Sequence, residues 1–122
     1  MSAVRDRASA ALDALLAKGL VGAGLVGRDG LPLLFRFTRP VPQETFAAMT
    51  AALVGAAEAA LQEIGQSGGG AVTAEAGSLR MAAAGVDDQH ILVLVAPTAV
   101  PADTLGQSLA MGRKSIQGVL RG

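Results

Sequence analysis

Apolar residues recur at helical spacing in three stretches of this chain. The first stretch lies before Gly19, a residue type common at helix C-termini, so we expect a helix that ends near that glycine. Its apolar positions are Val4, Ala8, Leu12, Leu15 and Leu16. The second stretch, Gln43 to Ile64, follows Pro42, and proline suits the first turn of a helix. The third stretch follows Pro101 and keeps helical spacing through Leu120.

Four further stretches are predicted to be strands that pair in two hairpins. Leu20–Gly27 and Leu31–Phe37 are apolar runs separated by Arg28-Asp29-Gly30, and Asp-Gly between such runs is a strong hairpin signal. Ala71–Ala76 and Ser78–Ala84 are expected to form the second hairpin. Because the run at 71–76 is short and polar, we expect it at an edge of the sheet.

A fifth strand is predicted at His90–Ala96, where every residue after the histidine is apolar. Such a strand is buried on both faces, so the sheet needs helices on both sides. The predicted fold is an α/β (α+β) three-layer sandwich with a five-stranded, mainly antiparallel sheet. We expect the long helix on one face and the N- and C-terminal helices on the other, in the order αββαβββα. Residues 1–122 fit a single domain.

The long helix has a bulky apolar side and a side of small residues. At about 100° per residue, the bulky side, which we expect to face the core, carries Phe46, Met49, Leu53, Ala57, Leu61 and Ile64. The opposite side carries Ala48, Ala51, Ala52, Gly55, Glu58, Ala59 and Gln62. A solitary surface helix would place more charged residues there. Because small residues let helix backbones approach closely, we expect this side to meet the same helix of a second copy.

Composition narrows the possible partners. The chain is 51% hydrophobic and only 16% charged, below the roughly 25% charged residues of typical soluble domains, and burial between copies would relieve that shortage. A formal net charge of +0 gives no electrostatic attraction to nucleic acid or an anionic membrane. The uncharged runs are shorter than the ~20 residues of a membrane span, so none is expected. The absence of cysteine and of a visible export signal favours a cytoplasmic location.

Two glycine patterns are similar to nucleotide-binding motifs but lack their context. Gly22-Ala23-Gly24-Leu25-Val26-Gly27 matches G-x-G-x-x-G, yet it lies in a strand that leads to a hairpin rather than to a helix. We interpret these glycines as positions that admit a closely packed helix. Gly106 and Gly112-Arg113-Lys114-Ser115 differ from a Walker loop in glycine spacing and lysine position, and are interpreted as the polar face of the last helix.

Candidate catalytic and metal-binding residues are few, and none lies in a cluster with metal-ligand spacing. His90 is the only histidine, and we interpret it as the first residue of a strand. Asp87-Asp88 is interpreted as turn chemistry. Four arginines could form a patch if the two hairpins shared an edge of the molecule, and are otherwise solvated strand-end charges; they are Arg28, Arg36, Arg39 and Arg80. We therefore expect no catalytic residue, no metal and no cofactor.

The element order and one turn resemble a known family. The turn is Val26-Gly27-Arg28-Asp29-Gly30-Leu31-Pro32, and it accompanies the alanine-rich central helix, the Leu92–Val95 strand and an amphipathic C-terminal helix. Together these features resemble the Roadblock family, which is named for a dynein light chain and includes small bacterial and archaeal partners of Ras-like GTPases. The family's valine-x-aspartate-glycine-leucine-proline turn is met with an extra Gly27-Arg28 pair before the aspartate. The resemblance covers essentially the whole chain.

The resemblance implies a homodimer in which the central helices lie side by side and the third strands pair edge to edge. It places Ala48, Ala52, Gly55 and Ala59 of the helix, and Val72 and Ala74 of the third strand, in the contact. The side of the long helix that carries small residues adds Ala51 and Gln62. The expected dimer interface is therefore Ala48, Ala51, Ala52, Gly55, Ala59, Gln62, Val72 and Ala74.

The expected function is a non-enzymatic scaffold or regulator that binds a small Ras-like GTPase or a signalling complex. Binding one nucleotide state of a GTPase more tightly than the other would shift its conformational population without a catalytic group. The alternative is a small-ligand sensor with an apolar pocket between the sheet and a helix. An aromatic content of 2% argues against that pocket, because aromatic side chains commonly line such sites.

Overall fold

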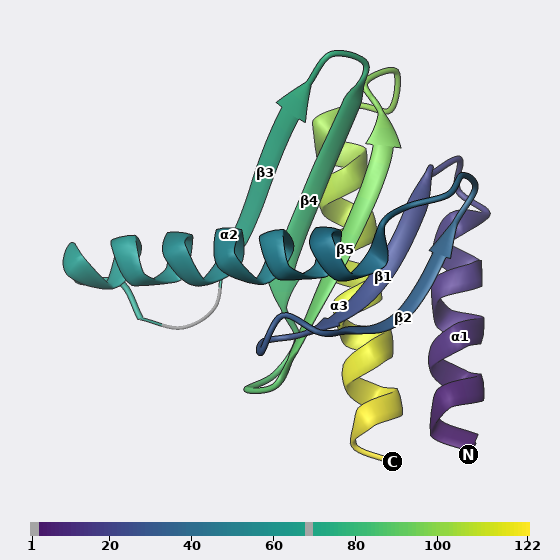
Figure 1. The fold of residues 1–122 in the computed structure, drawn as a ribbon, viewed down its shortest axis with the longest axis horizontal. Helices are drawn as coiled ribbons and strands as arrows, with labels where there is room; N and C mark the ends of the chain where they lie inside the picture. Colours follow the sequence, from purple (N-terminus) through teal and green to yellow (C-terminus); the bar gives the residue numbers. More distant parts are fainter. Residues whose placement is uncertain (1–2, 68–69) are drawn as a thin grey trace.

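The protein folds around one antiparallel sheet with helices on both faces (Figure 1). This computed structural model describes residues 3–67 and 70–122. The elements are α1 (Ala3–Leu16), β1 (Gly22–Gly27), β2 (Pro32–Phe37), α2 (Gln43–Glu63), β3 (Ala71–Ala76), β4 (Leu79–Gly85), β5 (His90–Pro97) and α3 (Ala102–Leu120). The strand order is β2-β1-β5-β4-β3, and every neighbouring pair is antiparallel. The predicted fold class and element order are confirmed.

One predicted glycine follows the first helix, and another lies in the turn of the first hairpin. Gly19 follows α1 with φ +86°, and Gly30 lies in the β1–β2 turn with φ +89°. These left-handed conformations favour glycine, which has no Cβ to clash with the backbone. The turn is completed by Asp29, whose Oδ1 accepts a hydrogen bond from the Leu31 N–H at 3.1 Å.

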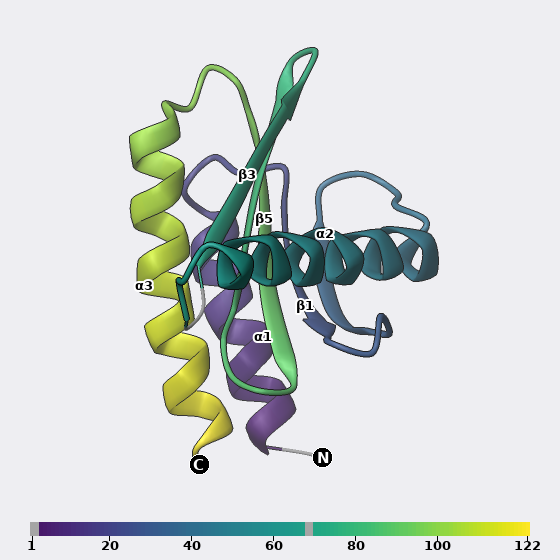
Figure 2. The same cartoon turned by 90° about the vertical axis from the view of Figure 1, so that its left-hand side faces the viewer.

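Helices α1 and α3 cover one face of the sheet, and Figure 2 shows them opposite α2. The larger core cluster lies between them and the strands, and includes Leu12, Leu92 and Ile116. Gly112 belongs to this contact rather than to the polar face of α3, because a Cβ there would lie 2.9 Å from both Leu15 and Leu92. The interpretation of residues 112–115 as entirely polar-face residues is therefore wrong at this glycine.

Two glycines of β1, Gly22 and Gly24, lie against aromatic rings and not against a helix, so the interpretation that they admit a closely packed helix is wrong. Gly22 pairs with Phe37, and a Cβ on Gly22 would lie 2.1 Å from that ring. Gly24 pairs with Phe35, and a Cβ on Gly24 would lie 3.4 Å from that ring and 3.3 Å from Val93. Since β1 continues into a hairpin and not a helix, the G-x-G-x-x-G match has a packing role.

Helix α2 packs on the opposite face through a narrower side than expected. Its buried residues are Ala47, Thr50 and Val54, which lie over a smaller core that includes Ala83 and Val93. Small side chains on both surfaces allow this close approach. Met49, Leu61 and Ile64, assigned to the inward side by sequence, are 67%, 44% and 77% exposed. That assignment is wrong for all three residues within a single copy.

Helix α2 is also long and apolar enough, by length and composition alone, to cross a membrane. Its side against the sheet includes the buried Thr50 and the half-buried, ion-paired Glu58. A helix packed on a sheet in this way is accounted for by the fold itself.

Candidate functional site

The C-terminal half of α2 extends beyond the last strand of the sheet (Figure 1). A helix of 21 residues is about 32 Å long, whereas five strands span only about 19 Å between the outermost two. Helix α2 contacts β1, β2, β3 and β4, and Figure 1 shows that its surplus length lies past β3. We call the exposed residues 59–64 the overhang.

One stripe of α2 changes from buried to exposed along its length. It contains residues three or four positions apart, which share one side of a helix. They are Ala47, Thr50, Val54, Ala57, Leu61 and Ile64. The first three are buried on the sheet, Ala57 is half-buried, and Leu61 and Ile64 in the overhang are 44% and 77% exposed. The apolar stripe therefore continues where the protein's own sheet has ended.

The predicted interface residues are largely accessible in the single chain. Ala48, Ala52, Gly55, Ala59 and Gln62 are exposed on α2, and Ala51 is half-buried. On β3, Ala74 is exposed and Val72 is half-buried. Both point to the same face of the sheet as α2, because Val72 pairs with Ala83 and Ala74 with Met81 in the core beneath that helix. Their contact with a second copy stays a prediction.

Strand β3 is a free edge with unoccupied backbone groups. The Thr98 N–H donates to Ser78 O and the Val86 N–H to His90 O, so even-numbered residues of β4 bond to β5 and odd-numbered ones to β3. Through the Ala74–Met81 pairing, alternate residues of β3 then turn their backbone groups outward. The outward residues are Ala71, Thr73 and Glu75. In residues 3–67 and 70–122, no side chain donates a hydrogen bond to a β3 carbonyl.

An apolar groove lies between α2 and the β3–β4 hairpin. Its volume is about 260 Å³. The apolar side chains that line it are Phe46, Ala74, Ala76, Leu79, Met81 and Val95. The groove is thus the part of the sheet that α2 leaves uncovered on the face where it packs. It lies directly beside the β3 edge.

An ion pair that we call the clamp fixes α2 to the end of the sheet where β1 and β4 finish, opposite the β3–β4 turn. Arg28, just after β1, donates to Glu58 of α2 from both terminal nitrogens, at 2.7 and 3.2 Å. Its Nε also donates to Asp87 O at 2.9 Å. Hydrogen bonding to Glu58 raises the pKa of the Arg28 guanidinium, outweighing the lowering effect of burial. Gly85 makes room for this arginine, since a Cβ there would lie 2.0 Å from its Nη2.

The β4–β5 turn beside the clamp is organised by Asp87. Its Oδ1 accepts hydrogen bonds from the Gln89 and His90 N–H groups, both at 2.8 Å, and lies 2.8 Å from His90 Nδ1. Burial acts to raise the pKa of Asp87, but these hydrogen bonds and His90 outweigh it and lower the pKa. The turn interpretation of this aspartate is confirmed.

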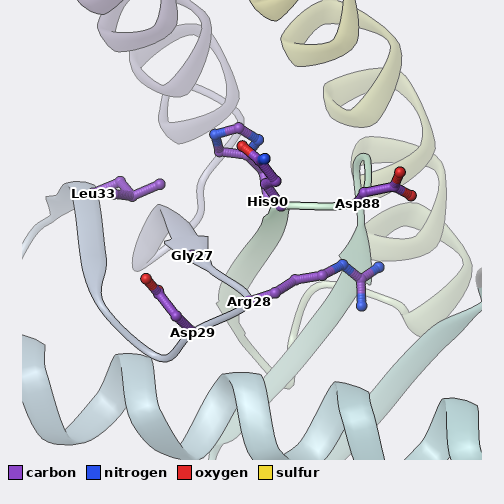
Figure 3. A pocket seen from close by; sticks show the side chains of 7 residues that line it. Gly27, Arg28, Asp29, Leu33, Asp88 and His90 are labelled. Atoms are coloured by element: carbon purple, nitrogen blue, oxygen red, sulfur yellow. The ribbon is translucent and has the colours of Figure 1, made fainter.

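A cavity of about 440 Å³ lies between the β1–β2 and β4–β5 turns. Figure 3 shows that Arg28, Asp29, Asp88 and His90 at this cavity point in different directions rather than toward one point. Among the described residues, no three His, Asp or Glu side chains are grouped to hold a metal ion. The cavity therefore offers no convergent set of groups for chemistry.

Three of the four arginines considered as a patch are held in separate ion pairs, and the fourth, Arg39, is exposed just after β2. Arg28 pairs with Glu58, Arg36 of β2 with Asp13, and Arg80 of β4 with Glu75. Because β1 and β5 separate β2 from β4, the two hairpins do not share an edge. The three paired arginines hold parts of the fold together and do not form one surface.

Comparison with known proteins identifies the family. The Roadblock/LC7 domain family matches residues 10–96, most of the chain. The protein belongs to the Roadblock/LC7 family. No curated protein sequence is significantly similar to it.

Solved structures share this Roadblock fold along nearly the entire chain. The gliding protein MglB from Thermus thermophilus has a TM-score of 0.90 at 19% identity, over 99% of this chain and 93% of that one. MglB from Myxococcus xanthus has a TM-score of 0.86 at 14% identity, over 94% and 95%. A Roadblock/LC7 domain from Streptomyces avermitilis has a TM-score of 0.83 at 21% identity, over 93% and 98%. At these identities the likeness concerns the fold.

Sequence reasoning missed two features of this Roadblock domain. The clamp joins residues 30 positions apart, and Glu58 was assigned to the outward side of its helix. A lone glutamate in an alanine-rich stretch was the available signal, because charges placed against a sheet need a partner. The second feature is the exposure of Met49, which follows from the rotation of α2 on the sheet.

Proposed function

We propose that this protein is a cytoplasmic, non-enzymatic scaffold that forms a homodimer and, as a dimer, binds a small Ras-like GTPase. The observation that carries the proposal is the apolar stripe of α2, which runs off the sheet at β3 into the exposed overhang. An exposed apolar surface beside a bare strand edge is suited to association with another chain.

A second copy related by a two-fold axis at β3 supplies the sheet surface that is missing beneath the overhang. Antiparallel pairing of the two β3 strands joins the sheets, so the partner's sheet continues beneath Leu61 and Ile64 of the first copy. By symmetry, the partner's overhang then lies over the first copy's apolar groove. One contact therefore accounts for the bare edge, the exposed stripe and the uncovered sheet face.

The same arrangement brings the two α2 helices together. Beside the buried stripe, α2 carries an outer stripe at the same three- and four-residue spacing: Met49, Ala52, Ala56 and Ala59. All four residues are exposed in the single chain. Small residues at three of these positions allow close backbone approach, and Met49 supplies an adaptable apolar contact. Ala52 and Ala59 belong to the predicted interface, whereas Met49 joins it through the observed rotation of α2.

Full burial of an exposed leucine, isoleucine or methionine contributes about 1.5–3 kcal/mol. Each copy offers Met49, Leu61 and Ile64, which are already partly covered to different extents. A symmetric dimer buries each set twice. The apolar term is therefore large enough to oppose the entropy lost on association, which is on the order of 4–15 kcal/mol.

Ile64→Asp tests the dimer. The side chain is 77% exposed in the single chain, so the substitution should leave folding intact. In the dimer it would bury a carboxylate on the partner's sheet, so light scattering after size exclusion should show monomers. Gln66→Asp, also exposed and beyond the helix, is the matched control and should remain dimeric. An Ile64→Asp protein with the mass of the wild type would remove the proposed contact.

The GTPase partner rests on family membership and on the fold shared with MglB. The scaffold would act by binding one nucleotide state more tightly, so a tenfold preference shifts the switch equilibrium by about 1.4 kcal/mol. Calorimetric titration with purified Ras-like GTPases of the same organism, loaded with GDP or a non-hydrolysable GTP analogue, tests this. We expect binding with at least a tenfold preference for one state. Equal affinity for both states would contradict the regulatory mechanism, and no binding to any of them would contradict the partner.

The apolar groove favours a small-ligand sensor as the second candidate. At about 260 Å³ it is near the lower size of ligand sites, which are commonly 300–1,000 Å³. A ligand there would compete with the partner's overhang. Thermal-shift screening of the Ile64→Asp monomer against metabolites separates the two, because a sensor should be stabilised by a ligand when its groove is uncovered.

A further inference from the structure

The edge of the sheet at β2 also turns backbone groups outward, but its pairing with β1 shifts register between Leu25 and Val26. The Thr38 N–H donates to Val21 O at 2.9 Å, so from Leu34 onward the even-numbered residues of β2 turn their backbone groups toward β1. Phe35 and Phe37 turn theirs outward, and Leu33 is the extra residue at the register shift. An incoming strand would bond to these groups, as at any free edge.

Two arginines donate hydrogen bonds to backbone carbonyls of β2. Arg5 of α1 donates from Nη1 to Leu33 O at 3.2 Å. Arg36 donates from Nη1 to Phe35 O at 3.1 Å. Hydrogen bonds from a charged donor are stronger than neutral ones, and the guanidinium groups also fill the space beside the strand. An incoming strand would have to displace both groups.

Arg36 is itself held in place from α1. Its Nε lies 3.2 Å from Asp13 Oδ1, and its Nη2 donates to Ser9 Oγ. The side chain therefore has anchoring contacts on α1 in addition to its contact at the strand edge. An arginine anchored in this way loses less conformational entropy on making the edge contact than a free surface arginine.

We propose that Arg5 and Arg36 are caps that close the β2 edge, so that a second copy of this chain cannot pair there and edge-to-edge assembly is confined to β3. The stoichiometric consequence rests on the proposed homodimer. If each copy has only one pairing edge, association closes at two copies, whereas two open edges on each copy would permit continued addition. Natural sheets use charged side chains for this purpose.

The double variant Arg5→Ala/Arg36→Ala tests the caps. Sedimentation velocity over a concentration series should reveal that the double variant associates further, beyond the dimer. The association constant of this step should be at least about tenfold above the upper limit measured for the wild type, as removal of a competing hydrogen bond implies. Asp13→Ala is the matched control, because it removes the ion pair to Arg36 but keeps the guanidinium donor. It should show no additional step.

Other outcomes separate this inference from the dimer itself. A wild-type monomer whose double variant self-associates would overturn the homodimer but support the caps. A wild-type dimer whose double variant remains a dimer at every concentration would overturn the caps alone. If the double variant does not fold by circular dichroism, Arg5→Ala alone carries the test, with a weaker additional step expected and the unchanged wild-type pattern again overturning the caps.

Discussion

The two edges of this sheet differ in what meets their outward backbone groups. At β2, Arg5 and Arg36 donate to the carbonyls of Leu33 and Phe35. At β3, no described side chain donates to a strand carbonyl, and the residues other than Glu75 are small or short. Beyond β3, moreover, α2 extends an exposed apolar stripe, whereas α2 begins near the β2 side.

This difference shows how one sheet can be directed to associate on one side only. Both edges turn backbone groups outward, so these groups alone select neither edge. We propose that side chains select the pairing edge, because they obstruct β2 and add an apolar contact beside β3. The proposed dimer depends on that asymmetry.

Proline at an outward position of each edge should give the largest effect. Thr73→Pro removes an outward N–H of β3 while leaving the bonds to β4. It should weaken dimerisation by at least about 100-fold, because each copy loses a ladder bond and gains a clash. Phe37→Pro makes the same change at β2, where residue 37 turns its N–H outward, and should alter dimerisation by less than about twofold. Native mass spectrometry across a dilution series measures both.

Equal weakening by the two proline variants would contradict the asymmetry of the edges. Circular dichroism spectra that match the wild type should accompany both variants. This control assigns the change in mass to the edge and not to loss of the fold.

The clamp supports the β3 side of the molecule, because it fixes the helix that extends past β3. Arg28→Ala leaves the carboxylate of Glu58 without its partner in a largely buried position. It should lower the free energy of unfolding by about 2 kcal/mol. Urea denaturation measures the change, and Arg39→Ala at an exposed position is the control. A change below about 0.5 kcal/mol would show that the clamp does not secure α2.

Thr50→Val sharpens the distinction between the buried and exposed parts of the α2 stripe. Thr50 is 1% exposed, and its Oγ1 has no hydrogen-bond partner among the described residues. Replacing the hydroxyl by a methyl should raise the free energy of unfolding by about 1 kcal/mol. Thermal unfolding should show a higher Tm with the same dimer affinity. A lower Tm would mean that the hydroxyl has a stabilising partner.

Asp87→Asn should have the smallest effect, because it changes a partly exposed turn away from both edges. The lowered pKa of Asp87 means that its ionised form stabilises the fold above the unfolded pKa of about 3.9, and that this contribution is lost as pH falls through the lower folded pKa. The variant should therefore have a slightly lower Tm at pH 7. Unfolding curves from pH 7 to acid should converge below about pH 3.9. A constant difference at all pH values would exclude the charge as the cause.

Much of the fold could be predicted because the sequence marks its boundaries locally. Asp29-Gly30 identified the first hairpin, and the polar run at Ala71–Ala76 identified an edge strand with the correct ends. Turn residues and strand alternation act over a few neighbouring positions, so they are legible without tertiary structure.

The rotation of α2 and the caps could not be predicted in the same way. An alanine-rich helix has only a weak hydrophobic contrast between its sides, so Met49 could be assigned inward while the smaller Ala47 is the buried residue. The contact between Arg5 and Leu33 joins positions 28 residues apart. Its existence depends on how α1 lies along β2, which only the folded chain determines.

We propose that the bare β3 edge and the overhang beside it join two copies of this chain. Sedimentation equilibrium of the wild-type protein measures this association without any substitution. We expect a species of twice the 12.1 kDa protomer mass that persists on dilution to micromolar concentration. A single 12.1 kDa species at the highest attainable concentration would contradict it.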